Sequence, residues 1–273
     1  MRLTKPLRAA ALAAVTVAAT AASVIVSEPA QADWVFNEDF NGTAGAQPST
    51  TRWTQQTGCE WGGRPADKER QCYTDGGHNA ELDGNGNLVI TARDEVTVVD
   101  GKSYQYTSAR VESNTLIGAG GGVEVRARMS GFEVGAWPAI WTLGQPEDVW
   151  PQYGEIDLME NGGGGSWVPQ WHVHTPANGN GAEFAGIDPS QWHIYEAEWT
   201  TGPQGTVKIS IDGVFVVEEP FVVPANSPAK IVLNVAVGGW ATDRQCPDGT
   251  WECKVSPDPD MNSTLTVDYA RAW

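Results

Sequence analysis

The sequence predicts an all-β protein, a β-sandwich or barrel built from short strands. Short runs that are apolar, or that alternate between apolar and polar residues, follow one another, and Gly, Pro, Asn or Asp interrupts them about every ten residues. No run carries the 3.6-residue spacing of an amphipathic helix. The segment SIDGVFV at 210–216 adds a hairpin signal, because Asp-Gly is a favoured two-residue turn between strands.

The clearest expected strands, in chain order, cover residues 87–93, 121–129, 192–200, 206–219, 230–239 and 263–273. We place a turn at Asp212-Gly213, inside the fourth of these segments. No internal repeat, Pro/Ser/Thr-rich linker or change of composition divides residues 33–273, so we expect a single domain there.

The first 32 residues have the pattern of a secretory signal peptide. Basic residues precede the Ala/Val-rich stretch 9–26, and the small-residue cleavage pattern Ala30-Gln31-Ala32 follows it. A membrane anchor is the alternative, because the apolar stretch approaches the length that spans a bilayer. The abundance of alanine and the cleavage pattern favour removal of residues 1–32, so we expect a secreted, extracellular protein.

The acidic composition limits the class of partner. The chain has 34 Asp+Glu against 17 Lys+Arg and a formal net charge of −17. Such a surface opposes binding to nucleic acid or to an anionic membrane. It says nothing for or against a neutral substrate such as a glucan, and a monomer is the default expectation.

Four cysteines, Cys59, Cys72, Cys246 and Cys253, allow three pairings. An oxidising compartment and the local spacing favour Cys59 with Cys72 and Cys246 with Cys253. A zinc site is the alternative, but neither couple has the C-x-x-C spacing of such sites.

The segment YGEIDLMEN, residues 153–161, carries three carboxylates at a spacing that fits no regular strand. Glu155 and Asp157 are two residues apart and would share one face. Simple alternation would turn Glu160 to the buried face, where an unpaired carboxylate is costly. One extra residue around Leu158–Met159, a β-bulge, would return Glu160 to the face of the other two, so we expect a bulge there.

Three carboxylates on one face are suited to glycoside hydrolysis. Retaining hydrolysis needs two carboxyl groups about 5–5.5 Å apart, one as nucleophile and one as acid and then base. Crowded like charges raise the pKa of one group, which keeps an acid protonated near neutral pH. A calcium site or a solvated strand face is the alternative. Nearby indole rings, which suit the apolar faces of sugars, favour catalysis; they are Trp137, Trp141, Trp150, Trp167 and Trp171.

Two neighbouring segments carry a resemblance to a known family. GAWPAIWTLG at 135–144 and WPQYGEIDLMEN at 150–161 resemble the signature of the bacterial laminarinase-type β-glucanases of glycoside hydrolase family sixteen, whose acid motif is E-x-D-x-x-E with a bulge. ERQCYT at 69–74, YTSARVES at 106–113 and LNVAVGGW at 233–240 agree in order along the chain. The lichenases of that family use E-x-D-x-E, so the extra residue favours the laminarinase branch.

The resemblance implies a concanavalin-like jelly roll, with two antiparallel sheets and a substrate cleft on the concave face. It implies retaining hydrolysis of internal β-1,3 bonds in laminarin-like β-glucans, with mixed β-1,3/1,4-glucan as a further substrate. Glu155 would be the nucleophile, Asp157 its assisting acid and Glu160 the acid/base.

The resemblance also implies which side chains hold the sugar. Trp137 and Trp141 would line the subsites nearest the cleaved bond. Asn79 and Arg110 would hydrogen-bond sugar hydroxyls on the non-reducing side, and His174 would lie near the acid/base.

No cofactor is expected for catalysis, but the resemblance implies a structural calcium ion on the convex side. Asp268 in the last expected strand is the matching carboxylate, with backbone oxygens from about Asp39 and Gly86, and calcium prefers such oxygen ligands. His172 and His174 could instead form a metal pair, in place of a hydrogen-bonding or structural role for His174, but the third ligand would have to be a catalytic acid.

Other functions compatible with this fold stay open. Legume lectins share the jelly roll, so a non-catalytic glycan-binding module is one alternative, although the presence of all three acids argues against it. A galactan-type polysaccharide as substrate is another. Transglycosylation is a third, because transfer and hydrolysis share the covalent intermediate.

Overall fold

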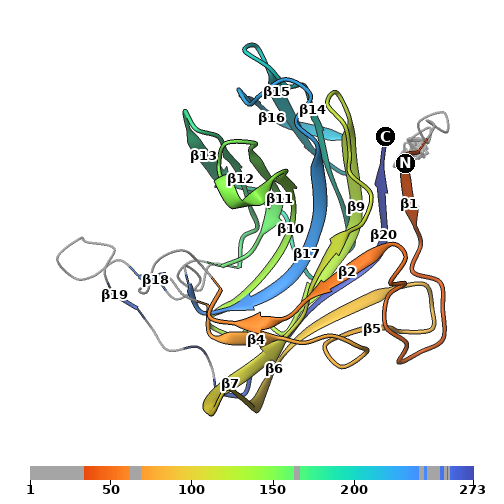
Figure 1. The fold of residues 1–273 in the computed structure, drawn as a ribbon, viewed down its shortest axis with the longest axis vertical. Coiled ribbons are helices and arrows are strands. Elements are labelled where there is room, and N and C mark those ends of the chain that lie inside the picture. The colour runs from red at the N-terminus through yellow and green to blue at the C-terminus, as the bar shows by residue number, and fades with distance from the viewer. Residues whose placement is uncertain are drawn as a thin grey trace, which may run out of the picture. The chain divides into compact units, whose positions relative to one another are not determined.

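The protein, described by a computed structural model, is built from two large β-sheets (Figure 1). The structure describes residues 34–61, 69–162, 167–239, 243–244, 253–254, 257 and 259–273. Residues 33–273 form one compact unit. Among the described residues, no helix has the length and apolar character needed to cross a membrane.

The larger sheet has eleven strands. They are β1 (Phe36–Glu38), β3 (Gly58–Cys59), β4 (Gln71–Tyr73), β5 (Ala80–Leu82), β6 (Leu88–Val99), β7 (Lys102–Ser108), β9 (Gly122–Ser130), β14 (His193–Trp199), β15 (Thr206–Ile211), β16 (Val214–Pro220) and β20 (Asn262–Ala272).

The smaller sheet has seven strands, in the spatial order β13-β12-β11-β10-β17-β8-β2. Their bounds are β2 (Trp53–Gln56), β8 (Arg110–Ser113), β10 (Ala136–Gly144), β11 (Glu155–Glu160), β12 (Gln170–His174), β13 (Gly179–Glu183) and β17 (Ala229–Val237). A short 3-10 helix, η2 (Glu147–Val149), and the two-stranded pair β18 (Asp243–Arg244) and β19 (Cys253–Lys254) are the other described elements.

Every segment predicted as a strand is a strand, and the hairpin turn is where the Asp-Gly signal placed it. Asp212 and Gly213 have φ of +52° and +73° and join β15 to β16. Positive φ at both central residues is the requirement of the tight hairpin turn that matches strand twist. Asp100 and Gly101, with φ of +52° and +77°, make the same kind of turn between β6 and β7, which the sequence analysis did not use.

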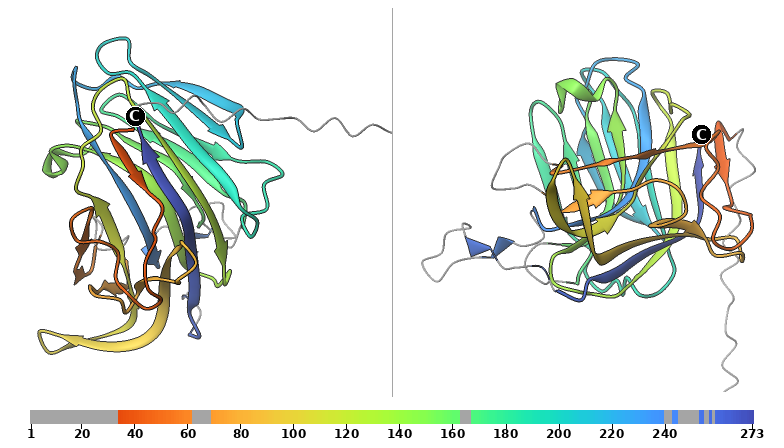
Figure 2. Two further views of the ribbon diagram at one scale, coloured as in Figure 1. Left: turned by 90° about the vertical axis from the view of Figure 1, so that its right-hand side faces the viewer. Right: turned by 60° about the horizontal axis from the view of Figure 1, so that its bottom comes forward.

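The two sheets pack face to face around one apolar core, as a β-sandwich requires (Figure 2). Strands β10, β11 and β17 of the smaller sheet contact β20, β14 and β6 of the larger one. The fold class is therefore confirmed. One detail differs from the expectation of purely antiparallel sheets, because β4 pairs with β7 in parallel.

The disulfide predicted between Cys59 and Cys72 is present. The two residues lie opposite each other on β3 and β4, so the bridge closes the segment between these strands at its base. The predicted pairing of Cys246 with Cys253 lies outside the described side chains.

Candidate active site

The acid segment forms strand β11, and the strand contains the expected bulge. On the β10 side, Ile140 is paired with Met159 but the next residue, Trp141, is paired with Asp157, so Leu158 is an extra residue. Leu158 and Met159 are both fully buried in the core. Two consecutive core-facing residues shift the phase of the strand by one, which is the effect of a bulge.

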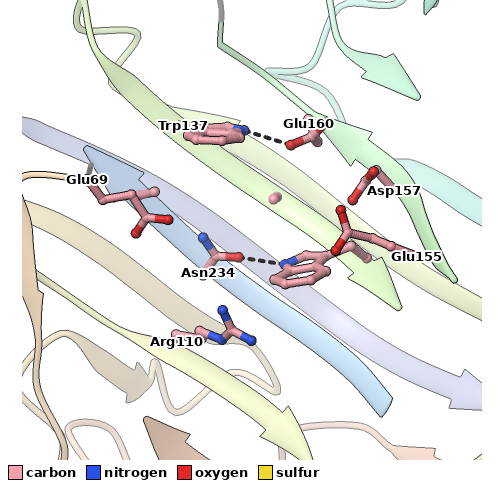
Figure 3. A pocket seen from close by; sticks show the side chains of 10 residues that line it. Glu69, Arg110, Trp137, Glu155, Asp157, Glu160 and Asn234 are labelled. Atoms are coloured by element: carbon pink, nitrogen blue, oxygen red, sulfur yellow. Dashed lines mark hydrogen bonds between the residues drawn. The ribbon is translucent and has the colours of Figure 1, made fainter. Parts of the chain in front are cut away.

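The bulge brings Glu155, Asp157 and Glu160 to one cavity of about 120 Å³ on the smaller sheet (Figure 3). Its walls come from strands β8, β10, β11 and β17 and from Glu69, which lies just before β4. The lining residues are Glu69, Arg110, Trp137, Ala139, Trp141, Glu155, Asp157, Glu160, Asn234 and Ala236.

Glu160 is held by two ring nitrogens. The Trp137 indole N–H donates to Oε1 at 2.8 Å, and His172 Nδ1 lies 2.7 Å from Oε2. Both partners come from strands that flank β11, so pairing of the strands fixes the direction of this carboxylate.

Glu155 and Asp157 share a second histidine. His174 Nε2 lies 3.4 Å from Asp157 Oδ2 and 3.8 Å from Glu155 Oε1. Trp150, on the loop before β11, donates its indole N–H to Glu155 Oε2 at 3.0 Å. Despite the nearby imidazole, Asp157 Oδ2 is buried without a hydrogen bond from any described residue.

Glu155, Asp157 and Glu160 form an acid row, and their surroundings do not stabilise three negative charges there. Burial raises the pKa of Asp157 well above its usual range, and the charge of Glu160 raises it further. Burial also raises the pKa of Glu155, with Asp157 adding to the shift and His174 opposing it. Asp157 lies within 4.8 Å of Glu155 on one side and of Glu160 on the other, so ionisation of one acid opposes ionisation of its neighbours.

Arg110 forms the opposite part of the cavity wall. Its guanidinium is stacked between two indoles, with Cζ 4.9 Å from the centre of the Trp61 ring and 4.8 Å from that of Trp141. Arg110 Nε donates to Glu112 Oε1 at 2.9 Å, so the side chain is held from behind as well as from both faces.

Comparison with known protein families identifies the family of the chain. Glycosyl hydrolases family 16 matches residues 67–271 of the chain. The chain belongs to this family. The predicted resemblance is therefore confirmed over most of the sequence.

Individual relatives of this family-16 chain include both catalytic and binding proteins. It is 29% identical to a beta-glucanase of Rhodothermus marinus over 88% of the chain and 84% of the relative. It is also 29% identical to a beta-1,3-glucan-binding protein of Penaeus monodon, over 56% of the chain and 50% of that protein. The solved catalytic domain of an endo-1,3-beta-glucanase from Thermotoga petrophila has a TM-score of 0.68 at 27% identity, with 88% of the chain and 96% of the domain covered.

The structure separates the predicted sugar-binding residues of this family-16 protein into two groups. Trp137, Trp141 and Arg110 line the cavity with the three acids. Asn79 does not line it: the side chain is 1% exposed and donates to the Thr91 carbonyl and to Thr107 Oγ1. Its position contradicts the predicted sugar contact, because the amide is used to join β6 and β7.

The predicted place of His174 is also corrected. The histidine in contact with Glu160 is His172, whereas His174 lies beside Asp157 and Glu155. The reason is strand register: β12 places His174 opposite Glu155 and His172 opposite Asp157, and the bulge then carries Glu160 back towards His172. Each histidine with two acids is spaced closely enough to hold a cation, but both groups use Asp157 and one of the expected catalytic acids.

Glu69, Asn234 and Trp150 are site residues whose roles the sequence analysis did not predict. Glu69 and Asn234 fall in ERQCYT and LNVAVGGW, two segments that carried the family resemblance, so a signal for both was present. Trp150 stands at the start of the acid signature, and its contact with Glu155 depends on the loop that contains η2.

Of the predicted calcium positions, Asp268 lies on β20 of the larger sheet, Asp39 follows β1, and Gly86 lies between β5 and β6. The Asp268 carboxylate forms an ion pair with Arg126, and Asp39 Oδ1 lies 3.3 Å from Arg271 Nη2. The backbone of Gly86 lies beside the Asp39 carbonyl. Arg126 therefore already neutralises the one carboxylate of the predicted set.

Proposed function

We propose that the protein is an endo-acting β-1,3-glucanase that hydrolyses its substrate with retention of configuration. The observation that carries the proposal is the cavity into which the bulge of β11 brings Glu155, Asp157 and Glu160 next to Trp137 and Trp141. The similarity to a beta-glucanase and to the catalytic domain of an endo-1,3-beta-glucanase supports this substrate class. A Zobellia galactanivorans protein with 26% identity was solved in complex with laminaritriose and laminaritetraose, which also supports it.

In the proposed reaction Glu155 attacks the anomeric carbon while Glu160 gives its proton to the leaving glycosidic oxygen. Water, deprotonated by Glu160, then hydrolyses the ester between Glu155 and the sugar. The Trp150 indole N–H orients Glu155, and the Trp137 N–H and His172 orient Glu160. Asp157 is close to both carboxyl groups and can pass its hydrogen bond to the carboxylate of Glu155 as the ester forms and breaks.

Incubation with laminarin, followed by proton NMR of the first products, tests this function directly. Retaining hydrolysis gives the β-anomer first, and internal cleavage gives a mixture of oligosaccharides before glucose accumulates. An α-anomer as first product would contradict the roles assigned to Glu155 and Glu160. A panel that adds lichenan, curdlan, agarose and carrageenan measures the activity on mixed-linkage glucan that we include in the proposal, and separates glucan from galactan substrates.

Glycan binding without catalysis is the second candidate, and the similarity to the Penaeus monodon beta-1,3-glucan-binding protein is the observation that favours it. Laminarin that binds but releases no reducing sugar would identify this function. Glucosyl transfer to an added laminarioligosaccharide, in place of release to water, would identify a transglycosylase. The full acid row, with each member hydrogen-bonded or close to a histidine, is the reason that hydrolysis is preferred.

Export and calcium binding are separate proposals. The signal-like pattern of residues 1–32 supports export, and the N-terminal sequence of the protein recovered from culture medium tests it. A calcium ion would take the Asp268 carboxylate with backbone oxygens of Asp39 and Gly86, and would have to displace Arg126. A rise in the melting temperature with calcium that Asp268→Asn abolishes would support this site, and equal melting in calcium and in EDTA would exclude it.

A further inference from the structure

The cavity contains a fourth carboxylate, that of Glu69, which the proposed reaction does not use. Figure 3 shows it across the cavity from the acid row, with Asn234 and Arg110 on its side. The residue lies just before β4, and its backbone pairs with Gly238, which directly follows β17. Glu69 is therefore fixed on the wall that a sugar chain would meet as it extends away from Glu155 and Glu160.

The two oxygens of Glu69 have different surroundings. Oε2 accepts from the Tyr73 hydroxyl at 3.0 Å and from the Gln71 amide. Oε1 accepts no hydrogen bond from any described residue. It is not fully buried, so a ligand in the cavity can reach it. One oxygen thus anchors the side chain, and the other is an accessible acceptor in a cavity that is proposed to receive hydroxyl groups.

The anchor extends to the tryptophan of the site. The Tyr73 hydroxyl accepts from Asn234 Nδ2 at 3.1 Å, and Asn234 Oδ1 accepts from the Trp141 indole N–H at 2.7 Å. A continuous chain of hydrogen bonds therefore joins Glu69 to Trp141, an indole that lines the same cavity. Such a network fixes both an apolar platform and a polar acceptor relative to each other.

Glu69 also changes the charge of the cavity. With it, the lining has four carboxyl groups against Arg110, whose charge is already shared with Glu112. Neutral sugar hydroxyls can donate to a carboxylate, whereas a sulfate, carboxylate or carboxymethyl group on the sugar would meet like charge in a partly buried site.

The geometry points to Glu69 as a specificity-determining residue that accepts hydrogen bonds from a neutral sugar and excludes anionic polysaccharides. This inference rests on the proposed glucanase function, and it goes beyond it because it names the charge class of the substrate. Neutral β-glucan is accepted and its anionic derivatives are discriminated against.

Kinetics with laminarin and carboxymethylated laminarin test the inference. Glu69→Gln keeps the shape and an acceptor oxygen but removes the charge, so kcat/KM on the neutral substrate should fall by less than about tenfold, while the preference for neutral over anionic substrate should shrink by about tenfold. Glu69→Ala should raise KM on laminarin by about 10- to 100-fold with little change in kcat. In the unsubstituted protein, added salt should reduce the ratio of kcat/KM on laminarin to kcat/KM on carboxymethylated laminarin, because salt screens the charge of Glu69.

Two controls distinguish recognition from support. Tyr73→Phe removes one anchor of Glu69 but keeps its carboxylate charge and the hydrogen bond from Gln71, so it should lower the melting temperature and keep the preference for the neutral substrate. Glu218→Gln, on exposed strand β16, removes the same charge far along the larger sheet and should change neither quantity.

An unchanged substrate preference in Glu69→Gln, or the same loss in Tyr73→Phe, would overturn the inference while the unsubstituted protein still cleaves laminarin. No cleavage of laminarin by the unsubstituted protein would instead overturn the proposed function itself.

Discussion

Two groups of buried carboxylates lie on the same sheet and have opposite properties. Glu112 on β8 is 2% exposed and accepts from Arg110, Lys230 and Gln56. Burial alone would raise its pKa, but the two cations and the hydrogen bonds outweigh burial and hold the pKa of Glu112 below its usual range. Asp157 on β11 is 3% exposed, has another acid on each side, and has a pKa well above the usual range.

The difference between Glu112 and Asp157 shows that burial alone does not decide whether a carboxyl group is ionised. At Glu112 the partners make ionisation favourable, so the carboxylate acts as a structural anchor for Arg110. At the acid row ionisation is opposed, which is costly for folding but keeps a proton available for chemistry. The comparison predicts that removal of an acid has opposite effects on stability in the two places.

The largest effect is expected for Glu155→Gln. The variant lacks the proposed nucleophile, so laminarin hydrolysis should fall by about a thousandfold or more. Because the amide cannot be charged, the free energy of unfolding should be unchanged or higher at neutral pH. Reducing-sugar assays and urea unfolding measure the two quantities, and an active variant would remove Glu155 from the nucleophile role.

Glu112→Ala should have the second-largest effect, on stability. It leaves Arg110 and Lys230 without their buried partner, and breaking such a pair costs about 3 kcal/mol of unfolding free energy. Glu95→Gln, in an exposed pair with His78, is the matched control and should change stability by no more than about 0.5 kcal/mol. Equal effects in both variants would show that the Glu112 cluster is no more than a surface pair.

Much of the fold follows from short-range rules that act on a few residues. The turn at Asp212-Gly213 was predictable because only some residues tolerate positive φ. Asp100-Gly101 follows the same rule and could have been predicted in the same way. The bulge was predictable because a strand in strict alternation would have buried Glu160. In each case the backbone and side-chain preferences of a few consecutive residues are enough to predict the local structure.

The rest of the site depends on which strands become neighbours, and that depends on the whole chain. Glu69 and Asn234 meet through Tyr73 only because β17, β8, β4 and β7 are brought together by the two sheets. His172 and His174 share a face of β12, so only the register with β11 decides which of them meets Glu160. A buried polar residue such as Asn79 can serve sheet pairing or substrate equally well on sequence alone.

Trp150→Phe sharpens the comparison within the acid row. It removes the indole N–H that donates to Glu155 while it keeps an aromatic ring beside His174. A hydrogen bond to a charged group contributes about 1.5–3 kcal/mol, so kcat on laminarin should fall by roughly tenfold or more. KM should change little if the bond matters only while Glu155 is charged, and a change confined to KM would instead place Trp150 in sugar binding.

The smallest effect, and the one that separates the two acid environments most clearly, is the pH dependence of stability. Asp157 has a raised pKa in the folded state, so the native protein binds more protons than the unfolded chain between the two pKa values. The unfolding free energy should therefore fall as pH rises through that window, which begins above the ordinary value of 3.8. Asp157→Asn cannot lose a proton, so it should flatten this decline and be more stable than the unsubstituted protein at neutral pH by about 1 kcal/mol or more. Urea unfolding at a series of pH values measures it. A variant that is less stable at neutral pH would show that Asp157 is an ionised anchor like Glu112, and the contrast between the two regions would then be lost.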